Sequence, residues 1–167
     1  WCTHSLALYT RCMKINKEYL QSAIFGINDA LVSTTGVIVG ITAGTNSKPI
    51  IVLAGVVTIM VEALSMGSGQ YLSLKSAQQL KKTSNQRVAI TSGVIMFLGY
   101  ILGGLVPLLP VILLPLEYSR ITTIICALIG LFILGYVKGE IVKVSPLRSA
   151  LEIFVIGGIS TAIGLAV

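Results

Sequence analysis

The chain has 167 residues, of which 54% are hydrophobic and only 11% are charged. Soluble domains carry about 25% charged residues, and the mean hydropathy of +0.92 is also high for a protein that folds in water, so the composition predicts an integral membrane protein. The net charge of +6 does not indicate nucleic-acid binding, because the basic residues form short clusters between apolar runs, as they do where membrane proteins set their orientation.

Five apolar runs follow one another, at about residues 20–43, 50–74, 88–114, 118–137 and 147–167. Each is long enough to cross a bilayer as a helix, which takes about 20 residues, and the connectors are too short to hold a separate soluble domain. The sequence therefore predicts an all-α fold, an integral membrane bundle of five transmembrane helices. In the third run we expect the helix to end near Leu105, because Pro107, Pro110 and Pro115 follow.

The first twelve residues precede Met13, which opens a segment typical of a natural start. We expect residues 1–12 to be an extension to which no function is assigned, and residues 13–167 to form a single five-helix transmembrane domain. The three cysteines are unevenly spaced and odd in number, which is not the pattern of a disulfide framework.

The basic residues divide unevenly between the two sides of this topology. Only Lys48 and Arg120 lie on one side. The other ten lie in the N-terminal segment and in the second and fourth connectors: Arg11, Lys14, Lys17, Lys75, Lys81, Lys82, Arg87, Lys138, Lys143 and Arg148. Because loops rich in Lys and Arg stay in the cytoplasm, we expect a cytoplasmic N-terminus and a C-terminus on the far side.

Small residues recur every four positions in two of the runs. Gly36, Gly40 and Gly44 form one stripe, and Gly99 and Gly103 form another. Such stripes let helices approach closely. We expect them to serve packing within one bundle, and a seam between two copies of the chain is the alternative.

Asp29 and Glu62 are each the sole charged residue in a long apolar run, the first and the second respectively. A charged side chain near the middle of a membrane costs on the order of 3 kcal/mol on insertion scales. Residues of this kind usually face the bundle interior or a wet cavity and handle ions or protons. The two carboxylates therefore indicate transport more strongly than any other feature of the sequence.

Further candidate ligands share the helical face of Glu62. Met66 and Gln70 follow it at spacings of four residues. Counted from the expected cytoplasmic helix ends, Asp29 and Met66 both lie roughly 12–14 Å deep at 1.5 Å per residue. If this face meets Asp29 and Asn28, carboxylates, amides and a thioether converge. Oxygen ligands suit divalent metals and a thioether favours the softer first-row ions, so the predicted metal ligands are Asp29, Glu62, Met66 and Gln70.

Each of these residues also has a structural interpretation. Met66 could fill the core, and Gln70 could lie at the interface with the headgroups. Asp29 could accept a hydrogen bond from a neighbouring helix, and Glu62 could be protonated and hydrogen-bonded. The metal-site hypothesis therefore depends on the shared depth of the residues rather than on any one of them.

Two segments resemble motifs of the vacuolar iron transporter family. Residues 25–34 read F-G-I-N-D-A-L-V-S-T and resemble its F-G-x-x-D-G-L-V-S-T opening. Residues 63–73 read A-L-S-M-G-S-G-Q-Y-L-S and resemble its A-x-S-M-x-x-G-E-Y-x-S motif. The resemblance implies a dimeric transporter that moves Fe²⁺, often Mn²⁺, out of the cytoplasm, generally against protons, with the pathway at the subunit interface. It places Asp29 and Met66 at positions of that pathway.

The sequence departs from the family pattern at three places. Gln70 stands where the motif has glutamate, and Glu62 stands where a small residue is common. The loop between the second and third runs, about a dozen residues long, has no room for the carboxylate-rich metal-binding domain of better-known members. Lys81 and Lys82 in that loop would repel cations. The resemblance is thus to a short form that lacks the cytoplasmic domain.

The leading hypothesis is a homodimeric Fe²⁺/Mn²⁺ exporter in which protons from the far side displace the metal by neutralising a carboxylate. Its partners would be the lipid bilayer, divalent metal ions and protons, with no cofactor besides the transported metal and no nucleic acid. It would lie in the cell membrane of a prokaryote, or in a vacuolar or other organelle membrane of a eukaryote. The alternatives are a non-transporting assembly module on the same fold and a transporter or channel for another cation. An enzyme is not expected, because the sequence offers no nucleophile–base pair.

Overall fold

The computed structural model describes residues 17–82 and 85–166, with side chains as far as Thr161, and its regular structure is entirely α-helical in this part of the chain. The expected extension at residues 1–12 lies outside the described residues. The helices are α2 (Lys17–Gly44), α3 (Lys48–Leu80), α4 (Gln86–Leu113), α5 (Leu116–Val142) and α6 (Pro146–Ala166). The all-α prediction is confirmed for these residues, and helices α2 to α5 are long and apolar enough to cross a membrane.

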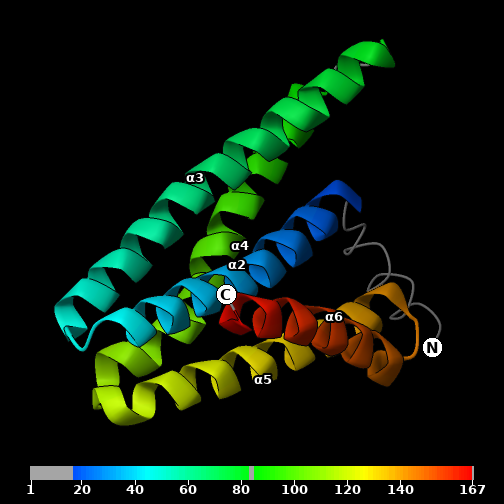
Figure 1. Cartoon of the computed structure of the whole chain (residues 1–167). Helices are drawn as coiled ribbons and strands as arrows, with labels where there is room; N and C mark the ends of the chain where they lie inside the picture. The colour runs from blue at the N-terminus through cyan, green and yellow to red at the C-terminus, as the bar shows by residue number, and fades with distance from the viewer. Residues whose placement is uncertain (1–16, 83–84, 167) are drawn as a thin grey trace, which may run out of the picture.

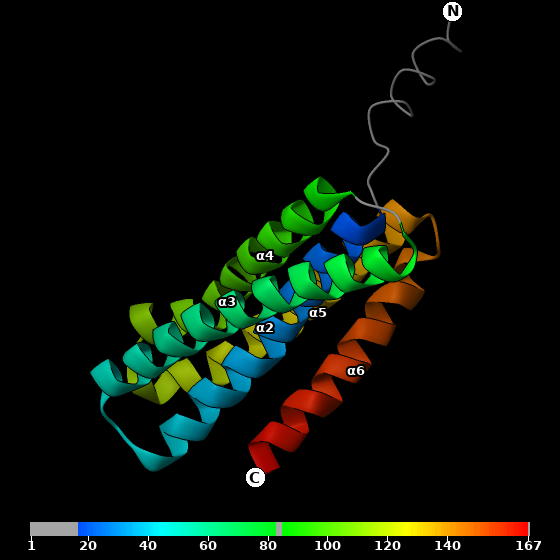
Figure 2. The same ribbon diagram turned by 90° about the horizontal axis from the view of Figure 1, so that it is seen from above.

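Helix α2 lies at the centre of the bundle and contacts each of the other four helices. Helices α3 and α4 pair on one side of it, and helices α5 and α6 pair on the other, with α4 also packed against α5 (Figure 1). The view from above shows the same arrangement (Figure 2). A side chain on α2 can therefore meet residues from either pair, which makes this helix the natural place for a shared site.

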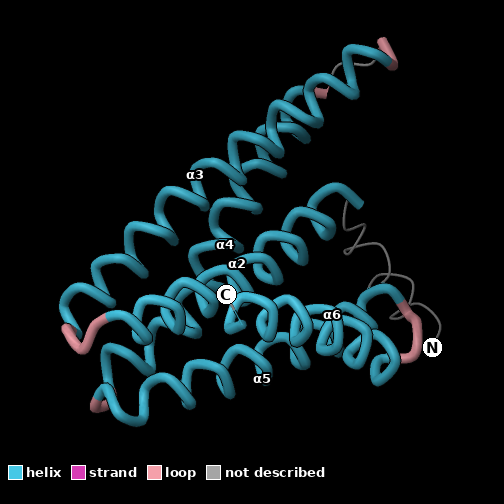
Figure 3. The backbone as a smooth tube through the Cα atoms, in the orientation of Figure 1, coloured by secondary structure: helices cyan, strands magenta, loops and turns pink. Residues whose placement is uncertain are grey.

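The helices extend beyond the apolar runs, so the connectors are shorter than the sequence predicts (Figure 3). The connectors span residues 45–47, 81–85, 114–115 and 143–145. Helix α3 has 33 residues and is roughly 50 Å long, against about 30 Å for the hydrocarbon core. Its last turns carry Lys75, Gln78 and Gln79, residues that favour helix, so helix continues after the apolar run has ended.

The prediction that the third helix ends near Leu105 is wrong, because α4 continues through Pro107 and Pro110 to Leu113. Each proline removes one backbone N–H donor from the helix. In lipid, however, non-helical backbone leaves still more polar groups without partners, and neighbouring helices can satisfy the few that proline frees. A membrane environment would therefore favour a helical backbone in this segment.

Donors from two other helices lie around this last part of α4. The hydroxyl of Thr123 on α5 donates to the carbonyl oxygen of Pro107 at 3.1 Å. The ammonium group of Lys48, at the start of α3, donates to the carbonyl oxygens of Ile112 at 2.8 Å and Leu114 at 3.1 Å. Lys48 thus stabilises the negative end of the α4 dipole, a structural role for one of the two basic residues that break the charge pattern.

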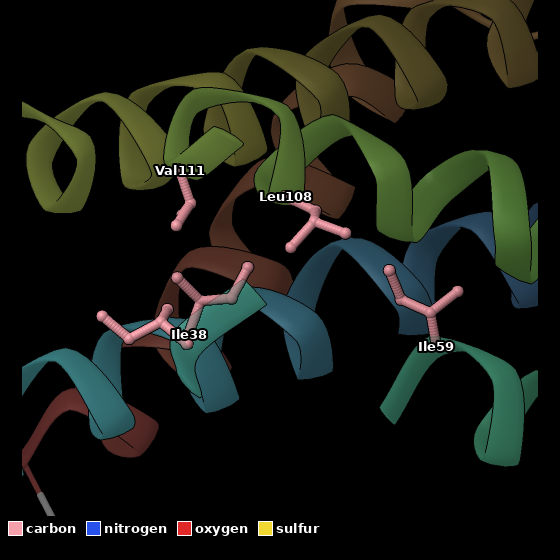
Figure 4. Close-up of a cluster of buried hydrophobic side chains, with 5 residues drawn as sticks. Ile38, Ile59, Leu108 and Val111 are labelled. Carbon is pink, nitrogen blue, oxygen red and sulfur yellow. The ribbon is translucent and has the colours of Figure 1, made fainter. Parts of the chain in front are cut away.

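A cluster of buried aliphatic side chains joins α2, α3 and α4 beside this end of α4. Ile38 comes from α2, Ile51 and Ile59 come from α3, and Leu108 and Val111 come from α4. Figure 4 shows side chains of all three helices converging in this cluster. It holds the three helices together on the side of the bundle where the predicted ligands lie.

The two glycine stripes differ in whether another helix packs against them. A Cβ atom on Gly103 would lie 2.8 Å from the carbonyl oxygen of Ile27, so this glycine permits the close contact of α4 with α2. The expectation of packing within one bundle is confirmed for Gly99 and Gly103. It is wrong for the stripe on α2, where a Cβ atom on Gly36, Gly40 or Gly44 would meet no described atom within 4 Å.

We expect Gly103→Ala to lower the thermal stability of the purified protein, because the added methyl group meets backbone and overpacking of this kind costs about 1–3 kcal/mol. Gly69→Ala is the matched control, since a Cβ atom there meets nothing within 4 Å and alanine favours helix by about 1 kcal/mol. Circular dichroism melts in detergent would measure both. Equal stability of the two variants would contradict the close contact of α2 with α4.

Candidate functional site

Two polar contacts set the register between the antiparallel helices α2 and α3. Toward the start of α2, the side-chain amide of Gln70 donates to the hydroxyl oxygen of Ser22 at 2.9 Å. Three turns further along α2, the hydroxyl of Ser33 donates to the Glu62 carboxylate at 3.1 Å. These contacts bring two of the four predicted ligands, Glu62 and Gln70, against α2.

The other two predicted ligands, Asp29 and Met66, lie between these contacts. Because the helices are antiparallel, the register places Asp29 of α2 level with Met66 of α3. Both side chains are half-buried. Met66 also packs against a buried cluster formed by Ala30, Ala63 and Tyr100, so its role as a packing residue and its position beside the carboxylates are compatible.

The carboxylate of Glu62 is held by hydroxyl groups from two other helices. Besides Ser33 of α2, the phenol of Tyr100 on α4 donates to the same oxygen, Oε2. The hydroxyl oxygens of Ser33 and Tyr100 are themselves 2.5 Å apart, and the Tyr100 side chain is fully buried. No described side chain donates to Oε1, so one carboxylate oxygen is fixed and the other can bind a cation.

Asp29 lies close enough to Glu62 for the two carboxylates to repel each other, and close enough to Tyr100 for its charge to act on the phenol. Two like charges in surroundings of low dielectric constant repel each other strongly. A proton on one carboxylate or a cation shared by both removes this repulsion. The pair therefore favours the binding of a proton or a cation.

Asn28 does not join this group, which corrects the expectation that it would converge with Asp29. It lines a cavity between α2, α5 and α6, together with Gln21, Lys138 and Glu152. The reason is the helical turn of about 100° per residue. Consecutive residues on α2 face different neighbours, so when Asp29 lies near α3 and α4, Asn28 turns toward α5 and α6.

The described residues contain no group of three or more His, Cys, Asp or Glu side chains placed to hold a metal ion. Within one chain the candidate ligands are thus two carboxylates, a thioether and an amide. Divalent transition metals commonly take four to six ligands, so these four side chains reach only the lower limit of that number, a sparse set for tight binding. A sparse site fits transient binding of a transported ion better than a resident metal centre.

Ser33 and Tyr100 belong to the site but were not predicted from the sequence. Ser33 lies one turn beyond Asp29 on α2, so the spacing of four residues could have found it. Tyr100 lies in an apolar run, where a buried phenol usually needs a hydrogen-bond partner, but nothing in the sequence identifies Glu62 of a different helix as that partner.

The chain resembles known proteins over most of its length. The model of the VIT family matches residues 20–89 and 81–167. Vacuolar iron transporter 1 of Arabidopsis thaliana is 25% identical, with 87% of this chain and 83% of the relative covered. Vacuolar iron transporter 1 of Eucalyptus grandis is 24% identical over the same shares. Vacuolar iron transporter homolog 3 of Arabidopsis thaliana is 28% identical, with 87% and 80% covered.

The alignment with the first of these relatives runs over 207 positions, more than this chain has residues, so it includes positions without a counterpart here. The relatives are transporters by name rather than enzymes, and they indicate no cofactor besides the metal ion itself. The family match extends over most of the chain, and the chain therefore belongs to the VIT family, the family of the vacuolar iron transporters.

Proposed function

We propose that the protein exports Fe²⁺ or Mn²⁺ from the cytoplasm in exchange for protons. The observation that carries this proposal is the pair of carboxylates, Asp29 of α2 and Glu62 of α3, on neighbouring helices that are long enough to span a membrane and that are joined by the Ser33–Glu62 hydrogen bond. Residues 13–167 would form one transmembrane domain in which α6 is the fifth span. The membrane would be the cell membrane of a prokaryote, or a vacuolar or other organelle membrane of a eukaryote.

The chemistry of the ligands favours a first-row transition metal over Mg²⁺ or Ca²⁺. Asp29 and Glu62 supply carboxylate oxygens, and Gln70 has an amide carbonyl oxygen that its hydrogen bond to Ser22 leaves available. Met66 adds a thioether sulfur at the level of Asp29. Oxygen ligands alone suit hard cations, whereas a thioether raises the preference for softer ions such as Fe²⁺.

Proton exchange follows from the same carboxylates. A metal ion bound between Asp29 and Glu62 neutralises both charges, and a proton that arrives from the far side competes for the same oxygens. Protonation of either carboxylate removes a negative charge and so weakens metal binding. Ser33 and Tyr100 hold Glu62 in place while its charge changes.

The charge distribution supports a cytoplasmic N-terminus. The α3–α4 and α5–α6 connectors lie at the same end of the bundle as the start of α2 (Figure 2). These segments carry most of the basic residues, Lys81, Lys82, Lys143 and Arg148 among them. By the positive-inside rule this end would face the cytoplasm. Lys48 lies at the other end, where it has its own structural partners.

A homodimer would complete the sparse ligand set by bringing two sites together. Support comes from the α2 stripe of Gly36, Gly40 and Gly44, which no described residue of the chain covers. Small residues of this kind let two helices approach closely in a membrane. If the α2 helix of a second copy packed on this stripe, the helix that carries Asp29 would lie in the dimer interface.

We expect the protein to have the mass of a dimer in mild detergent. Disulfide crosslinking of Gly40→Cys, in a background without the native cysteines, should join two copies, because this position lies on the uncovered stripe. Leu151→Cys is the matched control, since Leu151 is exposed on α6, away from that stripe. A monomeric mass together with no Gly40→Cys crosslink in native membranes would rule out the dimer.

We expect proteoliposomes of the parent protein to take up Fe²⁺ or Mn²⁺ under a pH gradient, and Asp29→Asn to lower the rate about tenfold or more, the effect of losing one charged ligand contact. The matched control is Glu140→Gln, a carboxylate-to-amide change on an exposed residue of α5. Transport by Asp29→Asn at the parent rate, for every metal and pH, would refute the proposed pathway. A parent that moves no metal would favour the non-transporting assembly module instead.

Two arms complete this experiment. Met66→Leu keeps the side-chain volume but removes the thioether, so it should reduce Fe²⁺ uptake more than Ca²⁺ uptake. An equal change for both would exclude Met66 as a ligand.

The orientation of the protein in the membrane can be measured with cysteines at Asn46 and Lys82 and membrane-impermeant labels. Labelling of both from one face would contradict the proposed orientation.

A further inference from the structure

Two cavities lie side by side at the α5–α6 end of the bundle, away from the carboxylate pair. The first has a volume of about 600 Å³ and surrounds the α5–α6 turn. The second has a volume of about 240 Å³ and extends between α2, α5 and α6. Lys138 and Glu152 line both, so the two cavities are neighbours that share these two side chains.

The first cavity has the chemistry of a phosphate site. Two cationic side chains line it, Lys138 from α5 and Arg148 from α6. Ser149 lines it as well; this residue is only 4% exposed, and its buried hydroxyl has no hydrogen-bond partner among the described residues. A buried hydroxyl without a partner is costly, and a phosphate oxygen would satisfy it once rotation of the Ser149 side chain turns the hydroxyl toward the cavity.

The start of α6 adds to this preference for an anion. Helix α6 begins at Pro146, and the backbone N–H of Ser149 makes its first helical bond, to the carbonyl oxygen of Ser145. Pro146 has no N–H, so the backbone N–H groups of Leu147 and Arg148 are the ones that project from the helix N-terminus, where the helix dipole is positive. Together with Arg148 and Ser149, this end of α6 is a favourable place for a phosphate group.

The second cavity has the chemistry of a hydrocarbon site that ends in polar groups. Its apolar lining comes from Phe25 of α2 and from Ile153 and Ile156 of α6. Phe25 and Ile156 are 52% and 59% exposed. In a helix bundle of this composition such side chains contact lipid tails. An acyl chain could thus lie against this wall while its headgroup occupies the first cavity.

Glu152 distinguishes among headgroups. Its carboxylate shares both cavities with Lys138, and no ion pair joins the two among the described residues. A purely anionic headgroup would meet repulsion from Glu152, whereas a headgroup that carries an ammonium group would find a partner in it. The combination of two cations and one carboxylate therefore matches a zwitterion that bears a phosphodiester and a primary ammonium.

From these observations we infer that the first and second cavities together bind a membrane phospholipid of the phosphoethanolamine class. Its phosphate contacts Lys138, Arg148 and the Ser149 hydroxyl, its ammonium group contacts Glu152, and an acyl chain lies along the second cavity. This inference is independent of the proposed transport, because lipid binding is measured without any metal flux.

Native mass spectrometry of the purified full chain, titrated with phosphatidylethanolamine, phosphatidylcholine and phosphatidylglycerol, tests the site. We expect phosphatidylethanolamine to bind most tightly, since the quaternary ammonium of choline has no N–H to donate and glycerol has no positive charge. Free phosphoethanolamine should bind far more weakly, because it lacks the acyl chain. Equal binding of all three lipids, or binding of the free headgroup as tight as that of the lipid, would overturn the proposal.

Variants locate the binding. Arg148→Gln should weaken phosphatidylethanolamine binding about tenfold, as expected for a lost charged hydrogen bond. The matched control is Arg87→Gln, which should leave binding unchanged because Arg87 lines neither cavity. Glu152→Gln should reduce the preference for phosphatidylethanolamine over phosphatidylcholine, and Glu140→Gln is its control. If Arg148→Gln fails to fold, Ser149→Ala, which only removes an oxygen, should still weaken binding. Unchanged binding in the folded variants would refute the site.

Discussion

The interaction on which the candidate site depends is the hydrogen bonding of the Glu62 carboxylate by the hydroxyls of Ser33 and Tyr100. These three residues come from α3, α2 and α4, so the contact ties together the three helices that surround the predicted ligands. A carboxylate among apolar helices is stable only if its charge is solvated, paired or protonated. The two hydroxyls provide part of that solvation at one oxygen, and the other oxygen remains available for a cation or a proton.

The position of α2 makes this contact possible. Because this helix touches all four others, residues that are consecutive in its sequence reach different parts of the bundle. Asp29 interacts with Glu62, whereas Asn28 lines the cavity beside α5 and α6. The close approach of α4 at Gly103 brings Tyr100 of the same helix near α2 and α3. The packing of small residues and the polar site are thus parts of one arrangement.

Much of the fold could be predicted from the sequence, because the bilayer imposes simple rules on the sequences of the helices that cross it. Apolar length identified the helices, and the spacing of four residues placed Glu62 and Gln70 on the one face of α3 that contacts α2. Local rules did not predict interactions between helices. They missed Tyr100 as the partner of Glu62, placed Asn28 with the wrong neighbours, and ended α4 too early, because they treated its prolines as the end of a helix that continues to Leu113. They also did not distinguish the buried glycines of α4 from the uncovered glycines of α2.

The most direct test of the central claim is a double-mutant cycle on metal binding with Glu62→Gln and Tyr100→Phe. Mn²⁺ affinity of the purified protein would be measured for the parent, both single variants and the double variant, with thermal melts to confirm folding. If Tyr100 acts by holding the Glu62 carboxylate, Tyr100→Phe should weaken Mn²⁺ binding about tenfold, the scale of a hydrogen bond to a charged group, and should have almost no effect once Glu62 is replaced. Additive effects of the two changes, or unchanged affinity in Tyr100→Phe, would contradict it.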